Sequence, residues 1–154
     1  MGHTISFSIF GKQSPYNVPA RVIGRSYAQH YPSKEHKNWQ ASVLVQALSF
    51  KPEEPWPGAV SLSLVFTRVK AKSHPKHPER CKDPRKALLA AEPIIKPDLT
   101  KLARIVEDAL KGIFWLDDSQ VVWQEFRKRW GGEYRTDVRI EFLGAVDVRR
   151  SQQP

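Results

Sequence analysis

The sequence predicts an α+β domain in which a mixed four-stranded sheet is covered by two helices. Two patterns and their order lead to this prediction. Alternation of apolar and polar residues, which is typical of half-buried strands, occurs over residues 4–10, 60–66, 122–130 and 134–142. Apolar residues at helical spacing occur over residues 34–48 and 99–111. The predicted order is therefore β-α-β-α-β-β, with Gly131-Gly132 as a hairpin turn between the last two strands.

The length of 154 residues predicts one domain, which we expect to span residues 1–143 and to be followed by a tail over residues 144–154. The net charge of +9 indicates polyanionic partners: polyphosphates, nucleic acid or anionic membrane surfaces. The apolar runs are far shorter than the roughly 20 residues of a membrane span, and the N-terminus lacks the pattern of a signal peptide. A lone Cys81 cannot form an internal disulfide. We therefore expect a soluble, cytoplasmic protein.

Two connections between the predicted elements are basic. Residues 11–33 carry prolines and three Lys or Arg, and they form either a basic arm along a nucleic-acid backbone or a solvated loop. Residues 68–86 hold eight Lys or Arg against two acids, and their position before the 99–111 helix favours a loop that holds phosphates over a merely solvated charge run. The candidate DNA-binding residues are Lys70, Lys72, His74, Lys76, Lys96 and Lys101. His74, His77 and Cys81 resemble half a zinc site, but no second ligand pair is nearby, so we expect a loop there.

The stretch 96–120, KPDLTKLARIVEDALKGIFWLDDSQ, has the strongest chemical pattern in the chain. On a helical wheel its apolar residues share one broad arc, while the opposite face carries Thr100, Arg104, Glu107, Asp108 and Lys111. A pair of carboxylates follows the helix after one apolar turn. The apolar arc must be buried, so the polar face points at a cleft or at solvent.

These residue types can serve phosphodiester hydrolysis. Mg²⁺ binds one or two carboxylates and keeps water and substrate phosphate at its other positions, and a nearby Lys or Arg neutralises developing charge. Asp98 before the helix, Asp117 and Asp118 after it, and Arg104 on its polar face supply such groups. The alternative is structural: Asp98 would cap the helix, and Asp117-Asp118 would be an ordinary turn.

The run from Lys96 to Val122 resembles the core motif of the RusA family of Holliday-junction resolvases, with its K-P-D, D-A-L and D-D-S-Q segments in the family's spacing. The resemblance implies a homodimeric, Mg²⁺-dependent endodeoxyribonuclease (Mn²⁺ being a possible substitute, with no small-molecule cofactor) that nicks two strands of a four-way junction symmetrically. It also implies a bacterial or phage origin, a part in DNA recombination and repair, and the same β-α-β-α-β-β layout.

Mapped onto this sequence, the family's catalytic and metal-binding pattern falls on Asp98, Arg104 and Asp118, with Asp117 as an acidic neighbour. Arg104 stands where the family has a functional lysine, and Thr100 stands where it has a second aspartate. A threonine is a poor metal ligand, so we expect Glu107, two turns further on the same face, to supply the missing carboxylate. The alternative is that Glu107 forms a salt bridge with Arg104 or Lys111.

Three functions are therefore open: a junction-resolving endonuclease, a junction-binding protein that lost catalysis with Thr100, and a general basic nucleic-acid-binding module. Two symmetric cuts require two sites facing one junction, which is why we expect a homodimer. Trp115, Trp123 and Trp130 are candidates for its interface, although each also fits a core position.

Overall fold

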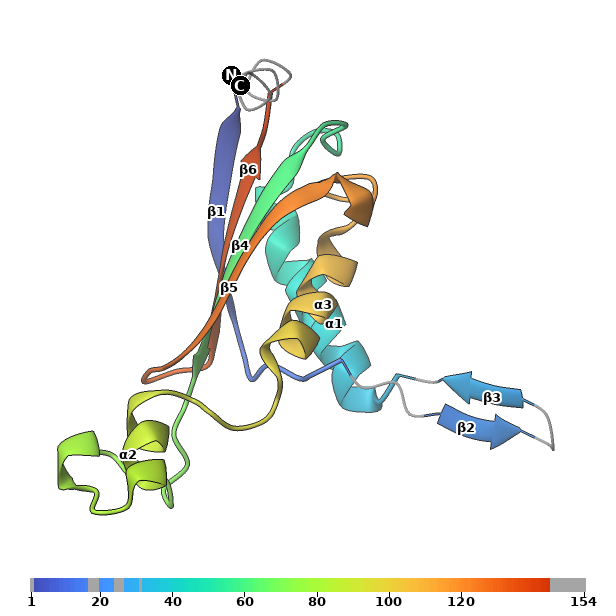
Figure 1. Cartoon of the computed structure of the whole chain (residues 1–154). Coiled ribbons are helices and arrows are strands. Elements are labelled where there is room, and N and C mark those ends of the chain that lie inside the picture. Colours follow the sequence, from blue (N-terminus) through green and yellow to red (C-terminus); the bar gives the residue numbers. More distant parts are fainter. Residues whose placement is uncertain (1, 17–19, 24–26, 31, 145–154) are drawn as a thin grey trace, which may run out of the picture.

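The computed structural model describes residues 2–16, 20–23, 27–30 and 32–144, and it has the predicted α+β architecture. A four-stranded mixed sheet has the order β1-β6-β4-β5. Its strands are β1 (His3–Phe10), β4 (Val60–Arg68), β5 (Val121–Trp130) and β6 (Arg135–Phe142). Helices α1 (Lys34–Ala47) and α3 (Leu99–Leu110) cover one face of this sheet (Figure 1). All six predicted elements are present, within about two residues of their predicted bounds.

The core lies between the sheet and these two helices. Alternate residues of β4, such as Leu62, Leu64 and Phe66, are fully buried, and the apolar arc of α3 is buried against them. The other face of the sheet is polar and solvent-facing at Ser6, Ser8 and Ser63. This division follows from the side-chain period of two along each strand. The polar face of α3 therefore has to point away from the core, as the helical wheel predicts.

The predicted hairpin between the last two strands is wrong. β5 runs parallel to β4 at the edge of the sheet, and β6 pairs with β4 on its other side, so the chain crosses the end of β4 between them. Gly131 N–H donates to the Arg68 carbonyl at this crossing, at 2.9 Å. A Cβ at Gly131 would collide with Thr67 Cγ2. Gly131 thus allows the backbone to pass close to the end of β4, where a side chain would not fit. The hairpin prediction did not consider this use of glycine.

The two basic connections contain secondary structure that was not predicted. β2 (Ala20–Ile23) and β3 (Tyr27–His30) form an antiparallel hairpin that projects from the body of the molecule (Figure 1). The segment after β4 contains a 3-10 turn, Pro78–Arg80, and helix α2 (Pro84–Ala91), so residues 84–86 are helical and not a loop. Pro84 occupies the first turn of α2 behind the N-cap Asp83, where proline favours a helix.

The described helices include none that is both long and apolar enough to cross a bilayer. Arg25, part of the predicted basic arm, lies outside the described residues, as does nearly all of the predicted tail.

Candidate functional site

The site residues are arranged along α3, which presents its polar face between two clusters of charge. Asp98, Lys96 and Lys101 lie at its N-terminal end, and Glu107, Asp108 and Asp118 lie at its C-terminal end. The 12 residues of α3 span about 18 Å. Two oxygens on one Mg²⁺ lie within about 4 Å of each other, given Mg–O distances of about 2.1 Å. Asp98 and Asp118 of one chain are therefore too far apart to share an ion.

Asp98 is the N-cap residue of α3 by position, but its carboxylate makes no capping hydrogen bond. Its Oδ2 lies 3.7 Å from Lys101 Nζ, and both side chains are more than half exposed. A hollow of about 350 Å³ opens beside it, lined by Lys96, Lys101 and Tyr16 among others. The structural interpretation of Asp98 as a cap is thus not supported, and the carboxylate is open to a ligand.

The backbone before Asp98 is held by a half-buried cation. Lys128 of β5 donates from Nζ to the carbonyls of Ile95 and Pro97, at 2.9 and 3.0 Å. Burial lowers the pKa of Lys128, as does the charge of Arg68, while Asp98 raises it. Lys128 lies on the helix-covered face of the sheet, where a lysine between apolar neighbours is the sequence signal that could have marked it.

Arg104 is exposed and stacks on an aromatic ring. Its guanidinium carbon lies 4.1 Å from the centroid of the Tyr16 ring. The N–H of Tyr16 donates to the Lys101 carbonyl at 2.9 Å, which ties the segment after β1 to α3. The Tyr16 ring also contacts His36 of α1, with centroids 5.0 Å apart. Local sequence patterns contain no signal for Tyr16, because it lies 88 residues before Arg104.

At the other end of α3, the charges of Glu107, Asp108 and Asp118 act on one another, and Asp118 pairs with Lys111. Lys111 Nζ lies 3.1 Å from Asp118 Oδ2, and the hydrogen bond and charge of Asp118 raise the pKa of Lys111. Burial raises the pKa of Glu107, and the charges of Asp118 and Asp108 raise it further. Burial likewise raises the pKa of Asp108, with Asp118 adding to the rise and Arg104 opposing it. Negative charge is thus concentrated here beyond what Lys111 balances.

Glu107 accepts a short hydrogen bond from Gln124 Nε2 of β5. The ion pairs among the described residues do not include Glu107, so the predicted alternative of a salt bridge with Arg104 or Lys111 is not what the structure shows. Gln124, like Lys128, is a polar residue on the helix-covered face of β5. The second carboxylate oxygen of Glu107 can therefore bind another partner. Glu107 lies more than two helical turns from Asp98.

Asp117 and Asp118 make different contacts: Asp118 pairs with Lys111, whereas Asp117 caps a turn. Asp117 caps the 3-10 turn Asp118–Gln120: it accepts from Ser119 N–H at 3.0 Å, which lowers its pKa, and it forms a capping box with Gln120. Gln120 also donates to the carbonyls of Trp56 and Gly58, both at 2.8 Å. The predicted role of Asp117 as a metal ligand stays untested, and its carboxylate is already used in the cap.

Of the predicted DNA-binding residues on the basic segment, two make internal hydrogen bonds and two are exposed. Lys70 and His74 hold the basic segment together: Lys70 donates to the Ala90 carbonyl at 2.6 Å, and His74 Nδ1 accepts from Ala71 N–H at 3.2 Å. Lys72 and Lys76 are exposed on the same segment and open to phosphates.

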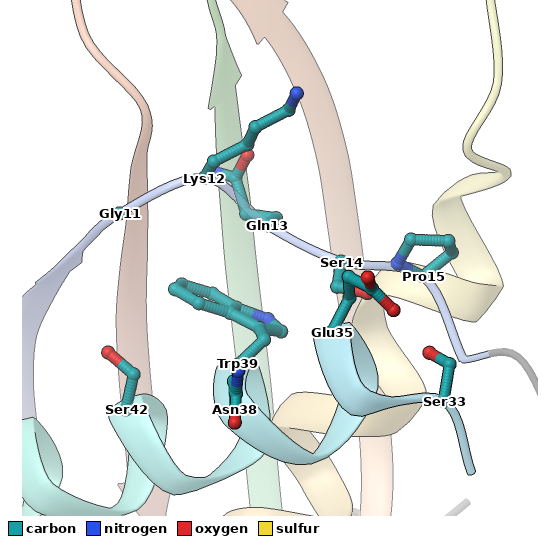
Figure 2. A pocket seen from close by; sticks show the side chains of 10 residues that line it. All are labelled: Gly11, Lys12, Gln13, Ser14, Pro15, Ser33, Glu35, Asn38, Trp39 and Ser42. Atoms are coloured by element: carbon teal, nitrogen blue, oxygen red, sulfur yellow. The ribbon is translucent and has the colours of Figure 1, made fainter.

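A groove of about 660 Å³ lies apart from these carboxylates, between residues 11–15 and the first half of α1 (Figure 2). Trp39 lies within its lining, and Lys12 and Glu35 are on its rim. None of the predicted catalytic or metal-binding residues lines it. Within the described residues, no three His, Cys, Asp or Glu side chains are close enough to hold a metal ion by themselves. A metal ion bound by the carboxylates along α3 would need water, phosphate or a second chain to supply additional ligands.

Two comparisons with known proteins show what this chain is similar to. The family model described as "Endodeoxyribonuclease RusA" matches residues 14–141, which include both ends of α3. The chain is also similar to the uncharacterized protein YqaN of Bacillus subtilis (strain 168), with 28% identity over 141 residues, 92% of this chain and 98% of YqaN.

Proposed function

This chain belongs to the RusA family of endodeoxyribonucleases, and from that membership we propose that it resolves four-way DNA junctions by paired, symmetric nicks with Mg²⁺ or Mn²⁺. The observation that carries the proposal is the polar face of α3, which lies inside the family match and is flanked by carboxylates and cations. The family supports endodeoxyribonuclease activity, and the metal, the paired cuts and a role in recombination and repair belong to the proposal.

The carboxylates of Glu107 and Asp118 would hold the metal ion, since the charge of Asp118 acts on Glu107 and Lys111, which pairs with Asp118, balances only part of the negative charge there. The ion would supply a water of lowered pKa and stabilise charge on the attacked phosphate. Arg104, halfway along the same face, neutralises charge on the phosphate oxygens. Lys96 and Lys101 hold the neighbouring phosphate at the N-terminal end of α3, where the helix dipole also favours an anion.

A homodimer would bring the N-terminal end of α3 in one copy close to the C-terminal end of α3 in the other copy. β5 is an edge strand of 10 residues, and α3 packs beside it. Antiparallel pairing of β5 with β5 of a second copy would set the two α3 helices side by side in opposite directions. Asp98 of one copy would then approach the carboxylates at the C-terminal end of α3 in the other. This arrangement would also give two sites for two cuts.

The alternative is a junction-binding protein with weak or no cleavage. Thr100, exposed on the first turn of α3, places a hydroxyl where the family has a carboxylate, and within the described residues no three-carboxylate metal cluster exists. The surviving acids Asp98 and Asp118 argue for the active enzyme.

One experiment separates these functions. The protein is incubated with a labelled four-way junction and with linear duplex of the same sequence, each with Mg²⁺ or with a chelator. We expect metal-dependent nicks at symmetric positions on the junction alone. Tight junction binding without nicks supports the alternative, and equal affinity for both DNAs supports a general nucleic-acid-binding module.

A further inference from the structure

Three apolar side chains are exposed on the segment between β4 and α3. Leu88 on α2 is 60% exposed, Ile94 is 60% exposed and Ile95 is 36% exposed. Two successive backbone turns, Glu92 N–H to the Leu88 carbonyl and Ile94 N–H to the Glu92 carbonyl, bring this stretch into a compact end of α2. We call these three side chains the α2 apolar tip. Figure 1 shows α2 projecting beyond one end of the sheet.

The backbone under the α2 apolar tip is fixed to the sheet. Trp130 Nε1 donates to the Leu89 carbonyl at 2.8 Å, Lys70 Nζ to the Ala90 carbonyl at 2.6 Å, and Lys128 Nζ to the Ile95 carbonyl at 2.9 Å. Ala90 and Pro93, which alternate with the exposed residues, are buried. The apolar side chains are therefore held outward on an anchored backbone.

The charge around the α2 apolar tip fits a polyanion. Residues 68–96 hold nine Lys or Arg and three Asp or Glu, a net +6 out of the +9 of the whole chain. Each of the three acids has a partner inside the protein: His77 for Glu79, the Arg85 N–H for Asp83, and Arg127 for Glu92. The segment that carries the tip is consequently strongly cationic in net charge.

We propose that Leu88, Ile94 and Ile95 form a wedge that inserts between base pairs at the branch point of a four-way junction, while the surrounding Lys and Arg bind its phosphates. The proposal rests on the function proposed above. A branch point interrupts base stacking, so an apolar side chain can enter there at a lower cost than in continuous duplex. The tip continues directly into Lys96, Pro97 and Asp98, so it would fix the branch point next to the candidate site.

The test uses junctions with 2-aminopurine at the branch point, whose fluorescence rises when the base is unstacked. We expect the wild-type chain to raise this signal and L88A/I94A to abolish it, with junction affinity about tenfold lower and duplex affinity unchanged. Leu88→Met keeps an apolar side chain and should keep the signal. Val45→Ala is the matched control, because Val45 is 67% exposed on α1 and away from the basic segment.

An unchanged fluorescence signal and affinity in L88A/I94A, with the wild-type chain still cutting the junction, would overturn the wedge and leave the proposed function intact. Equal losses on junction and duplex would overturn it too, since they indicate general surface contact. A tip that binds anionic vesicles instead, with L88A/I94A failing to co-float while junction binding is kept, would assign it to a membrane surface. Absence of junction cleavage by the wild-type chain would contradict the proposed function itself.

Discussion

At the scale of single residues, the contact between Arg104 and Tyr16 is one that a lysine at position 104 would not match in geometry. A planar guanidinium stacks on an aromatic ring, whereas an ammonium is a compact charge without a flat face. Tyr16 therefore holds the cation of the candidate site in one place. Its role is positioning, because its ring touches Arg104 and its N–H anchors the segment to α3.

We predict that Tyr16→Ala lowers the junction-cleavage rate about fivefold, because a cation–π contact contributes roughly 1 kcal/mol and its loss frees the guanidinium. Tyr16→Phe should retain most of the rate, since the ring is kept. Arg104→Lys should lose rate in the wild-type background but little more in the Tyr16→Ala background. Single-turnover cleavage assays provide the measurement. Equal, additive losses from the two substitutions would contradict coupling between these side chains.

The raised pKa of Glu107 leads to a prediction about stability. Between its ordinary pKa of 4.5 and its raised folded value, the folded chain binds more protons than the unfolded chain. Stability should therefore fall as pH rises through this window, and Mg²⁺ should restore it at the upper end by balancing the charge. Melting temperatures across pH, with and without Mg²⁺, measure both effects.

Glu107→Gln should flatten the pH dependence and weaken the stabilisation by Mg²⁺. Glu141→Gln is a suitable control, because Glu141 lies on β6 and pairs with Arg139. If Mg²⁺ stabilised E107Q as much as the wild-type chain, Glu107 would not be a metal ligand.

The residue types of the candidate site could be predicted from the sequence. Their separation into one cluster at each end of α3 could not. Helical periodicity placed Arg104 and Glu107 on one exposed face, and the structure confirms this. The separation of Asp98 from Asp118 depends on the path of the chain after α3, which motif spacing does not encode. Tyr16, Gln124 and Lys128 reach the site through tertiary packing, so local patterns could not assign them.

At the scale of elements, alternation and helical periodicity predicted the six main elements, because each has one buried and one exposed face. These patterns did not predict which strands pair with one another in the sheet. Gly131-Gly132 has the composition of a hairpin turn, yet the chain passes over the end of β4 to reach the far side. α2 was not predicted, because residues 68–86 were interpreted as a basic loop, although Pro84 is at a helical position that favours proline.

The crossing over β4 predicts different effects for two adjacent glycines. Gly131→Ala should destabilise the fold by roughly 1–3 kcal/mol, because the new methyl group would meet the Thr67 side chain, which is buried and β-branched. Gly132→Ala should change stability by less than about 0.5 kcal/mol, since no atom lies within 4 Å of its added Cβ. Urea denaturation measures both. Equal effects would argue against the observed crossing.

At the scale of the whole molecule, the uneven distribution of charge predicts how DNA binding responds to salt. Each phosphate contact contributes about 0.9 to the slope of log affinity against log salt concentration. Lys72→Ala and Lys76→Ala should each reduce the slope by about 1. Lys51→Ala should not, because Lys51 precedes β4 and the basic segment follows its other end. Junction affinity that did not change with salt would contradict an electrostatic role for residues 68–86.

The β5 edge predicts a specific self-pairing for the proposed homodimer. Trp123 is 65% exposed on this edge strand, which fits its predicted place in an interface, whereas Trp115 is buried in the core. Antiparallel pairing centred on Phe126 would place Glu125 opposite Arg127 of the partner subunit and Trp123 opposite Arg129 of the partner subunit. Edge strands with such free backbone groups pair readily with another copy. The charges along β5 would then select one register.

Charge reversal tests this pairing directly. Glu125→Arg should weaken the dimer in sedimentation equilibrium, because it would face Arg127 of the partner subunit. The double variant E125R/R127E exchanges the two signs and should restore the dimer. Since Asp98 would meet the partner's carboxylates only in the dimer, Mg²⁺-dependent junction cleavage should fall and recover with the oligomeric state. A dimer that is unaffected by Glu125→Arg would place the interface elsewhere, and a monomer that cuts junctions at the full rate would remove the need for a second copy.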